Sequence, residues 1–165
     1  MALGATVLLT SKRGKRSLPV EDFFTGRGET PFALETDEMV SEIRLPFPEK
    51  RQGSGFQKLT YRSALDFALV SSAAWIEGID GKITGVRIVV GGAGASPLLL
   101  REASDRFIGR PVHDRGFLEE AQNIVSKHAA PFMVDNLGST LEYRRKMSGV
   151  MAKKALQEAI ERLES

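Results

Sequence analysis

The order of strand-like and helix-like segments constrains the fold of this chain more than any other feature. Residues 55–90 show the pattern of three strands, and Asp80-Gly81 between the last two predicts a tight hairpin turn. Further along, apolar residues recur at helical spacing and predict helices at 98–108, 116–129 and 139–164. Because strands come first and helices follow, we predict an α+β unit: a three-stranded antiparallel sheet with three helices on one face.

Two parts of this unit depend on local signals. Residues 66–77 are apolar and rich in small side chains, which fits a strand or a helix packed closely on both faces, and we favour the strand. The run Ser139-Thr140-Leu141-Glu142 has the spacing of a capping box and predicts the start of the long last helix.

The first 48 residues form a second, shorter unit that is rich in β-structure. Residues 40–45 alternate apolar and polar side chains, as a half-buried strand does, and Pro46 ends them. A charged, glycine-rich stretch at 49–55 then marks a boundary, which predicts units at 1–48 and 54–165. The remaining expectations are a strand at 5–10, a solvated basic hairpin turn at 12–16 and a short helical turn at 17–24.

Composition excludes several classes of protein. The 165 residues include no cysteine, so the chain has neither disulfides nor thiolate metal ligands, as is usual in a cytoplasmic protein. A formal net charge of +2 is too small to indicate nucleic-acid binding. No apolar run approaches the roughly 20 residues of a membrane span. The two histidines, His113 and His128, lack carboxylates at ligand spacing, so we predict no metal site.

Four stretches, in this order and spacing, resemble one family. The first runs from Leu3-Gly4-Ala5-Thr6-Val7 through Asp22-Phe23-Phe24-Thr25-Gly26 to Glu42-Ile43-Arg44-Leu45-Pro46, and the second is residues 56–68. The third is Gly91-Gly92-Ala93-Gly94 with Pro97 and Arg101-Glu102-Ala103, and the fourth begins at Tyr143-Arg144-Arg145-Lys146-Met147. Together they resemble the FAD-carrying medium subunit of molybdenum hydroxylases, the family of carbon monoxide dehydrogenase, xanthine dehydrogenase and 4-hydroxybenzoyl-CoA reductase.

The resemblance implies an oxidoreductase module whose FAD passes electrons between iron–sulfur clusters and an external acceptor. Its partners would be an iron–sulfur subunit and a molybdopterin subunit. In the family, glycine-rich loops of the N-terminal half hold the FAD pyrophosphate, and neither they nor their Thr-Ile-Gly-Gly-Asn run occurs in this sequence. We therefore expect the isolated chain to bind FAD weakly or not at all, and to be inactive alone.

The resemblance also assigns candidate cofactor residues. Lys58 matches a position beside the flavin ring, where a cation stabilises the anionic reduced form; the alternative is a strand lysine facing water. Val40 matches a position that approaches the isoalloxazine, and it also fits an ordinary core valine. Arg62 and Asp66 match a segment near the flavin that influences access of the carrier; the alternative is a surface ion pair.

Two further motifs invite a functional reading. Gly91-Gly92-Ala93-Gly94 lacks the spacing of a phosphate-binding loop, and we interpret it as a tight turn between strand and helix. Tyr143-Arg144-Arg145-Lys146 fits a basic subunit contact or a solvated helix face, and we favour the solvated face.

Three hypotheses of different classes therefore remain. The chain is part of an oxidoreductase, a non-enzymatic assembly module, or a free-standing domain with an unrelated ligand site. By resemblance, the strands at 5–10 and 40–45 belong to a subdomain whose other elements are absent from the sequence. Such strands expose an edge that pairs with another chain, so we expect a homo-oligomer or a partner-dependent fold.

Overall fold

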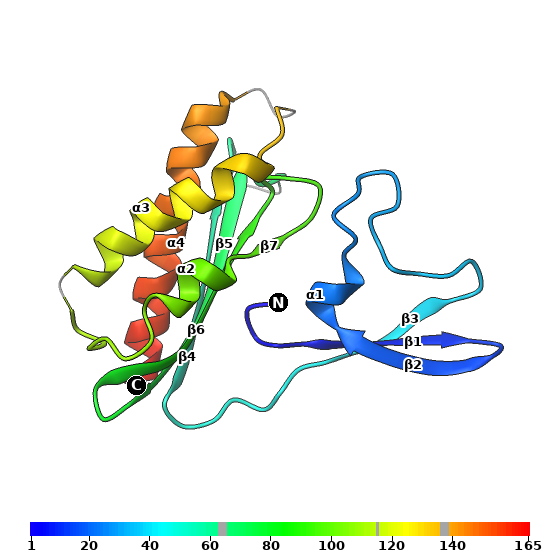
Figure 1. Ribbon diagram of the computed structural model, residues 1–165, viewed down its shortest axis with the longest axis horizontal. Helices are drawn as coiled ribbons and strands as arrows, with labels where there is room; N and C mark the ends of the chain where they lie inside the picture. The colour runs from blue at the N-terminus through cyan, green and yellow to red at the C-terminus, as the bar shows by residue number, and fades with distance from the viewer. Residues whose placement is uncertain (63–65, 115, 136–138) are drawn as a thin grey trace.

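The computed structural model describes residues 1–62, 66–114, 116–135 and 139–165. They form a three-stranded sheet of order β2-β1-β3 and a four-stranded sheet of order β4-β5-β6-β7, with the longer helices beside the second sheet (Figure 1). In this described part of the chain, no helix is long and apolar enough to cross a membrane.

The four-stranded sheet is antiparallel throughout and is formed by β4 (Gln52–Leu59), β5 (Val70–Ile79), β6 (Lys82–Gly91) and β7 (Leu98–Leu99). The predicted α+β arrangement is confirmed, with one strand more than expected. The additional strand β7 comes from the start of the segment predicted as a helix at 98–108, which is helical only in α2 (Arg101–Asp105). The helix prediction was wrong there because Leu98 and Leu99 pair with the outer edge of β6.

The β5–β6 hairpin forms where the sequence predicts it. Asp80 and Gly81 both have positive φ, 51° and 73°, as a two-residue hairpin turn of the favoured twist requires. The apolar segment that fits either a strand or a helix is a strand from Val70 onward, so the preference for a strand is confirmed.

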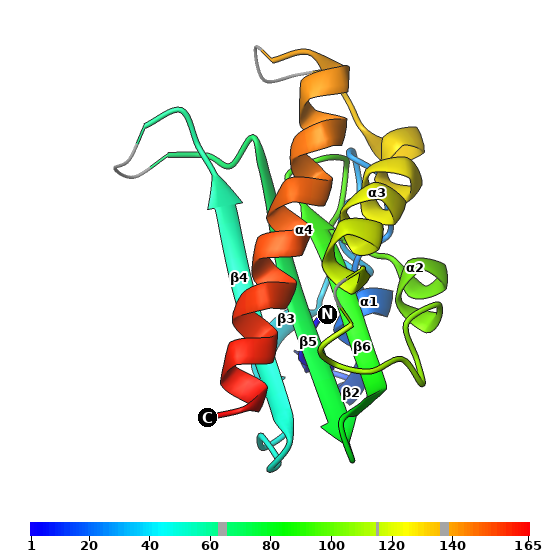
Figure 2. The ribbon, with the colours of Figure 1, turned by 90° about the vertical axis from the view of Figure 1, so that its left-hand side faces the viewer.

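The helices cover one face of this sheet. The long helix α4 (Leu141–Leu163) lies directly on β4 and β5, α3 (Phe117–Ala129) packs against α4, and α2 lies beside β6 (Figure 2). A short 3₁₀ turn, Ala130–Phe132, follows α3.

Helix α4 begins one residue later than the capping-box prediction implies. Thr140 is the N-cap, and its hydroxyl accepts a hydrogen bond of 3.2 Å from the Tyr143 N–H. Ser139 therefore lies outside the helix, and Glu142 does not occupy the third helical position that a capping box needs.

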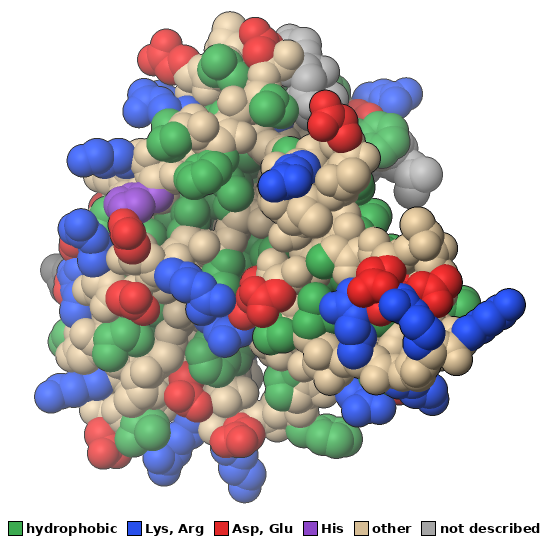
Figure 3. Space-filling model, turned by 45° about the vertical axis from the view of Figure 1, so that its right-hand side comes forward, with side chains coloured by type: hydrophobic (Ala, Val, Ile, Leu, Met, Phe, Trp, Pro, Cys, Tyr) green, Lys and Arg blue, Asp and Glu red, His purple; other side chains and the backbone are tan. Residues whose placement is uncertain are grey.

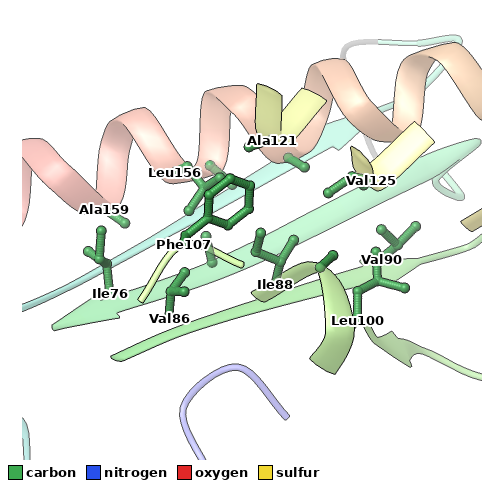
Figure 4. Close-up of a cluster of buried hydrophobic side chains, with 14 of the residues drawn as sticks. Ile76, Val86, Ile88, Val90, Leu100, Phe107, Ala121, Val125, Leu156 and Ala159 are labelled. Carbon is green, nitrogen blue, oxygen red and sulfur yellow. The ribbon is translucent and has the colours of Figure 1, made fainter. Parts of the chain in front are cut away.

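The core lies between the sheet and the helices. Strand residues alternate between two faces, and the inward set packs against apolar side chains of all three helical segments. Figure 4 shows this cluster, which includes Ile76, Val86, Ile88 and Val90 from the strands and Phe107, Ala121, Val125, Leu156 and Ala159 from the helical side.

The contact between α4 and β4 is close enough to involve the backbone. A Cβ atom added at Gly53 would lie 1.9 Å from the Ala159 carbonyl oxygen, and one at Gly55 would lie 2.1 Å from that of Ala155. Only glycine on the strand and a small residue on the helix allow this approach.

The smaller sheet consists of β1 (Thr6–Ser11), β2 (Gly14–Pro19) and β3 (Met39–Arg44), and the one-turn helix α1 (Val20–Phe23) lies beside it. The helical turn predicted at 17–24 is shorter than expected, because residues 17–19 pair with β1. A small core of Val7, Leu9 and Phe23 holds this unit together.

The basic residues at the β1–β2 turn are paired with an acidic segment. Arg13 contacts Glu35 and Asp37, and Arg16 contacts Glu38 at 2.6 Å. Figure 3 shows these red and blue side chains gathered at the right-hand edge of the molecule. The Arg16 guanidinium lowers the pKa of the Glu38 carboxyl from 4.5 to about 2. The hairpin is as predicted, and its cations hold the 35–38 segment in place.

Side chains of α4 cover the free edge of β4. The Glu158 carboxylate accepts a hydrogen bond of 3.0 Å from the Phe56 N–H, and Arg162 donates one of 2.8 Å to the Ser54 carbonyl. These bonds satisfy outward-pointing backbone groups that would otherwise pair with another strand. The same Phe56 N–H is the first cause of a lowered pKa at Glu158.

We predict that Glu158→Ala lowers the free energy of unfolding by about 1.5–3 kcal/mol, the range for hydrogen bonds to a charged group. The matched control is Glu161→Ala, one turn along α4, which should change it by no more than about 0.5 kcal/mol. Urea unfolding followed by circular dichroism measures both. Equal losses in the two variants would show that β4 needs no such protection.

Candidate functional site

The face of the four-stranded sheet turned away from the helices forms the candidate site, and we call it the open face. Because residues in register share a face, three rows cross it. These rows are Lys58, Ser71 and Gly91; Phe56, Ala73 and Val89; and Ser54, Trp75 and Arg87. Ser71, Ala73 and Gly91 are small, so no large side chain stands on the β5 and β6 side of Lys58 or on β5 beside Phe56.

The N-terminal unit lies on this side of the sheet (Figure 1). Arg87 Nη1 donates to the Met1 carbonyl at 3.2 Å, and Arg101 of α2 pairs with Glu21 of α1 at 3.2 Å. A hollow with hydrophobic side chains separates the two units in Figure 3. The residues of the open face nearest Lys58 are less covered than those nearest Arg87, since Phe56 is 58% exposed and Lys58 is also exposed.

Lys58 is fixed at the margin of the open face. It lies near the end of β4, in register with Ser71, and its Nζ donates a hydrogen bond of 2.9 Å to the Asp66 carbonyl. The lysine is therefore an exposed strand residue, as in the alternative of a strand lysine facing water. Its ammonium group is nevertheless held by the hydrogen bond to the Asp66 carbonyl.

Arg62 and Asp66 form the ion pair that their spacing suggests. Asp66 Oδ2 accepts from the Arg62 N–H at 3.2 Å, and the Arg62 guanidinium approaches Asp66 Oδ1 at 3.4 Å. The guanidinium is the largest cause of a lowered pKa at Asp66, and the nearby Lys58 ammonium lowers it further. Three of the four candidate residues thus meet at one end of β4; the intervening residues 63–65 lie outside the described part of the chain.

Val40 lies apart from these three residues. It is on β3 of the other sheet, opposite Leu9, and is 37% exposed. The interpretation as a core valine fits poorly, because the buried cluster of that unit consists of Val7, Leu9 and Phe23 with other neighbours. Among residues 1–62 and 66–114, no hydrogen bond or ion pair joins Val40 to Lys58, so their shared role stays a prediction.

Sequence reasoning missed Phe56 and the small residues beside it. For Ser71 and Ala73 the signal is the alternation in β5, where Val70, Ser72, Ala74 and Ile76 are buried and the residues between them are small or aromatic. Only the pairing of three strands shows that Ser71, Ala73 and Gly91 lie side by side.

The glycine-rich run is a packing turn, but it joins the strands β6 and β7, so the prediction of a turn between strand and helix was wrong about the element that follows. A Cβ atom at Gly92, whose φ is +72°, would lie 3.0 Å from the Ala68 carbonyl, and one at Gly94 would lie 2.4 Å from that of Phe132. These glycines let the β6–β7 connection approach the backbone of Ala68 and of Phe132 closely.

The solvated-face interpretation of Tyr143–Lys146 was wrong for Arg144, which is fully buried because it shares the inward side of α4 with Ser148.

An apolar hollow of about 440 Å³ lies between the Ser54–Trp75 row of the open face and the connecting residues 45–48. None of the four candidate residues lines it; its walls are Leu3, Leu45, Pro46, Phe47, Pro48, Gln52, Gly53, Ser54 and Trp75. Across residues 1–62, 66–114, 116–135 and 139–165, no three His, Asp or Glu side chains gather as a metal site would need.

Comparison with known proteins places the chain in a family. The model of the CO dehydrogenase flavoprotein C-terminal domain matches residues 56–159, and that of the FAD-binding domain in molybdopterin dehydrogenase matches residues 1–48. The chain belongs to the family of FAD-binding flavoprotein subunits of molybdenum-hydroxylase-type enzymes.

Individual relatives agree with this assignment. Caffeine dehydrogenase subunit beta of Pseudomonas sp. (strain CBB1) is 31% identical over 98% of this chain and 53% of its own length. The carbon monoxide dehydrogenase medium chain of Afipia carboxidovorans is 31% identical over 95% of this chain and 52% of its own. The chain thus spans about half the length of the curated relatives it matches.

The fold agrees as well. The structure of reconstituted CO dehydrogenase from Oligotropha carboxidovorans superposes with a TM-score of 0.85 at 28% identity. That superposition covers 98% of this chain and 54% of the other. The resemblance proposed from sequence motifs is confirmed at the level of family and fold.

We predict that Asp66→Asn loosens the segment next to Lys58 without unfolding the sheet. The amide keeps the size of the side chain but loses the charge that holds the Arg62 N–H and guanidinium. Hydrogen exchange at the Arg62 and Phe67 amides should become faster, while the midpoint of urea unfolding stays the same. The wild type should show the same change as the pH falls through the lowered pKa of Asp66, below its ordinary 3.8.

The matched control is Glu42→Gln, which removes the exposed ion pair with Arg44 in the other sheet. It should leave the exchange of Arg62 and Phe67 unchanged. A drop in the unfolding midpoint for Asp66→Asn alone would assign Asp66 to the general stability of the fold instead.

Proposed function

We propose that this chain forms the flavin-facing part of the FAD subunit of a molybdenum-hydroxylase-type oxidoreductase. In that role it relays electrons between iron–sulfur clusters and an external acceptor through FAD. The observation that carries the proposal is the open face, where a positioned cation, Lys58, borders the small residues Ser71, Ala73 and Gly91. The family match supports the same conclusion.

The open face fits the ring of the cofactor. Ser71, Ala73 and Gly91 leave room over the strands for a planar group, and Phe56 offers an exposed aromatic side chain at its edge. When bound, FAD supplies the electron-transfer chemistry itself. The role of Lys58 is to place positive charge at the ring, where it favours the anionic reduced flavin over the neutral oxidised one.

The pyrophosphate of FAD needs backbone N–H groups, and the strand residues Ser71, Ala73 and Gly91 of the open face do not offer them. The glycine-rich run Gly91–Gly94 is committed to packing against Ala68 and Phe132. We therefore propose that the ring contacts, with Val40 and Lys58 among them, give only weak binding of FAD to this chain alone. Tight binding then requires further polypeptide that supplies an anion site.

We also propose the setting in which the chain acts. Its partners are an iron–sulfur subunit and a molybdopterin subunit of one cytoplasmic complex. The support for the complex is that related proteins are named as a subunit or as a medium chain. The support for the compartment is the absence of cysteine.

Visible absorbance tests the proposal directly. The purified chain is mixed with excess FAD, and titration of the flavin band and fluorescence gives the affinity. We expect weak binding, lost on gel filtration, and a further loss in Phe56→Ala, which removes the exposed ring. A chain that shows no interaction with FAD at any accessible concentration would contradict the ring-binding role of the open face.

Lys58→Met then tests the role of the cation. In the chain saturated with FAD, we expect the reduction potential of the flavin to fall by about 30 mV or more. For a two-electron couple that corresponds to roughly tenfold weaker binding of the reduced form. The control is Lys154→Met, an exposed lysine on α4, which should leave the potential unchanged. Equal potentials in Lys58→Met and wild type would remove Lys58 from the site.

A second candidate function, a non-enzymatic assembly module, is favoured by strand β3. This strand is at the edge of its sheet and is exposed along its whole length, with Ile43 62% and Met39 65% exposed. An apolar edge of this kind is a template for pairing with another chain. We propose that the isolated chain forms a homo-oligomer through β3.

Analytical ultracentrifugation tests this candidate. The isolated chain should sediment above the 18.1 kDa of a monomer in a concentration-dependent manner. Ile43→Glu should return it to a monomer, because a charge on β3 opposes pairing. Ile108→Glu, at a site that is 47% exposed and lies in the other unit, is the matched control and should leave the oligomer intact. A monomeric wild type would exclude the assembly role for this chain alone.

A further inference from the structure

Arg144 is the largest fully buried side chain in the described part of the protein. It lies in the first turns of α4, and among the described residues its guanidinium donates to three backbone carbonyls. Nε donates to Leu69 at 3.1 Å, Nη1 donates to Val134, and Nη2 donates to Gly92. A buried charge is costly, so an arrangement of this kind persists only where its hydrogen bonds compensate for lost solvation.

The three carbonyls belong to three different connections of the chain. Leu69 ends the connection from β4 to β5, Gly92 follows β6, and Val134 lies between α3 and α4. These connections also contact one another: the Val134 N–H donates to the Ala93 carbonyl at 2.9 Å. The planar guanidinium carries five N–H donors in a fixed arrangement, so a single arginine can hold all three segments at once.

One of these segments positions Lys58. The Leu69 N–H donates to the Leu59 carbonyl at 2.9 Å, and Lys58 Nζ donates to the Asp66 carbonyl at 2.9 Å. Residues 66–69 are thus bonded to the end of β4 on one side and to Arg144 on the other. A shift of Leu69 would be passed on to the acceptor that orients the Lys58 ammonium.

We propose that Arg144 is a positioning residue of the flavin site. By fixing the Leu69 carbonyl against the Gly92 and Val134 carbonyls, it keeps residues 66–69 in the place where Asp66 orients the Lys58 ammonium at the open face. The functional meaning of this role rests on the proposed function, in which Lys58 borders the flavin ring. The positioning itself is a property of the chain without cofactor.

Amide hydrogen exchange and side-chain NMR of the full chain test the proposal. In Arg144→Met, which keeps much of the length but has no donors, the Leu69 amide should exchange at least about tenfold faster relative to Ile76 in the centre of the sheet, as expected for loss of a charged hydrogen bond of about 1.4 kcal/mol. The ¹³Cε resonance of Lys58 should move toward that of the exposed Lys154.

Two further variants separate positioning from general stability. Arg144→Lys keeps the charge but cannot hold three carbonyls at once, so it should show the same local pattern to a smaller degree even if Arg144→Met fails to fold. Arg110→Met removes the ion pairs with Asp114 and Glu120 at the other end of α3. It should leave the Lys58 resonance and the ratio of Leu69 to Ile76 exchange unchanged.

The overturning result is equal acceleration at Leu69 and Ile76 with an unmoved Lys58 resonance, since a purely structural arginine would act on the whole sheet. Binding of FAD to the wild type is measured separately. If the wild type fails to bind FAD but Arg144→Lys shows the local pattern, the proposed function falls and the positioning role stands. If the wild type binds FAD and Arg144→Lys shows no local change, the positioning role falls alone.

Discussion

The close contact of α4 with β4 and β5 is the constraint on which the rest of the structure depends. The helix approaches until the carbonyls of Ala155 and Ala159 lie where side chains of Gly53 and Gly55 would be. At this distance the side chains of Glu158 and Arg162 reach the edge strand β4 and form hydrogen bonds with its outward-pointing backbone groups. The same helix carries Arg144 into the centre of three connections. One packing contact therefore sets the core, the protection of the edge and the arrangement at the end of the sheet.

Covering one face of the sheet determines what the other face can do. Since strand side chains alternate, the residues committed to the helical core leave an opposite set that includes Lys58, Ser71 and Ala73. The N-terminal unit stands on that side and is tied to the sheet through Arg87 and Arg101. The candidate site is thus the uncovered face of the sheet, and it is bordered by residues 66–69, which two hydrogen bonds to β4 and the buried Arg144 guanidinium hold in place.

The individual site residues were predictable to different degrees. Lys58, Arg62 and Asp66 were identified from a family resemblance, and the structure brings them together at one end of β4, although their role at a flavin is still a prediction. Val40 was identified in the same way but lies in the other sheet, because its position depends on pairing with β1. Arg144 was misread as part of a solvated patch, because a run of neighbouring basic residues hides that only one of them faces inward. Its spacing of three and seven from the apolar residues Met147 and Met151, which puts it on the apolar side of the helix, was the available signal.

What the sequence by itself determined is the local and periodic part of the structure. The Asp80-Gly81 turn, the alternation of β6, the helical spacing of α3 and α4, and the family motifs follow from short-range patterns of side chains. The tertiary structure alone decided features that join distant segments. The pairing of Leu98 and Leu99 with β6, the open face built from three strands, and the three carbonyls held by Arg144 belong to this group. Such contacts depend on which segments meet in space, and neither propensity nor periodicity within one segment encodes the partner.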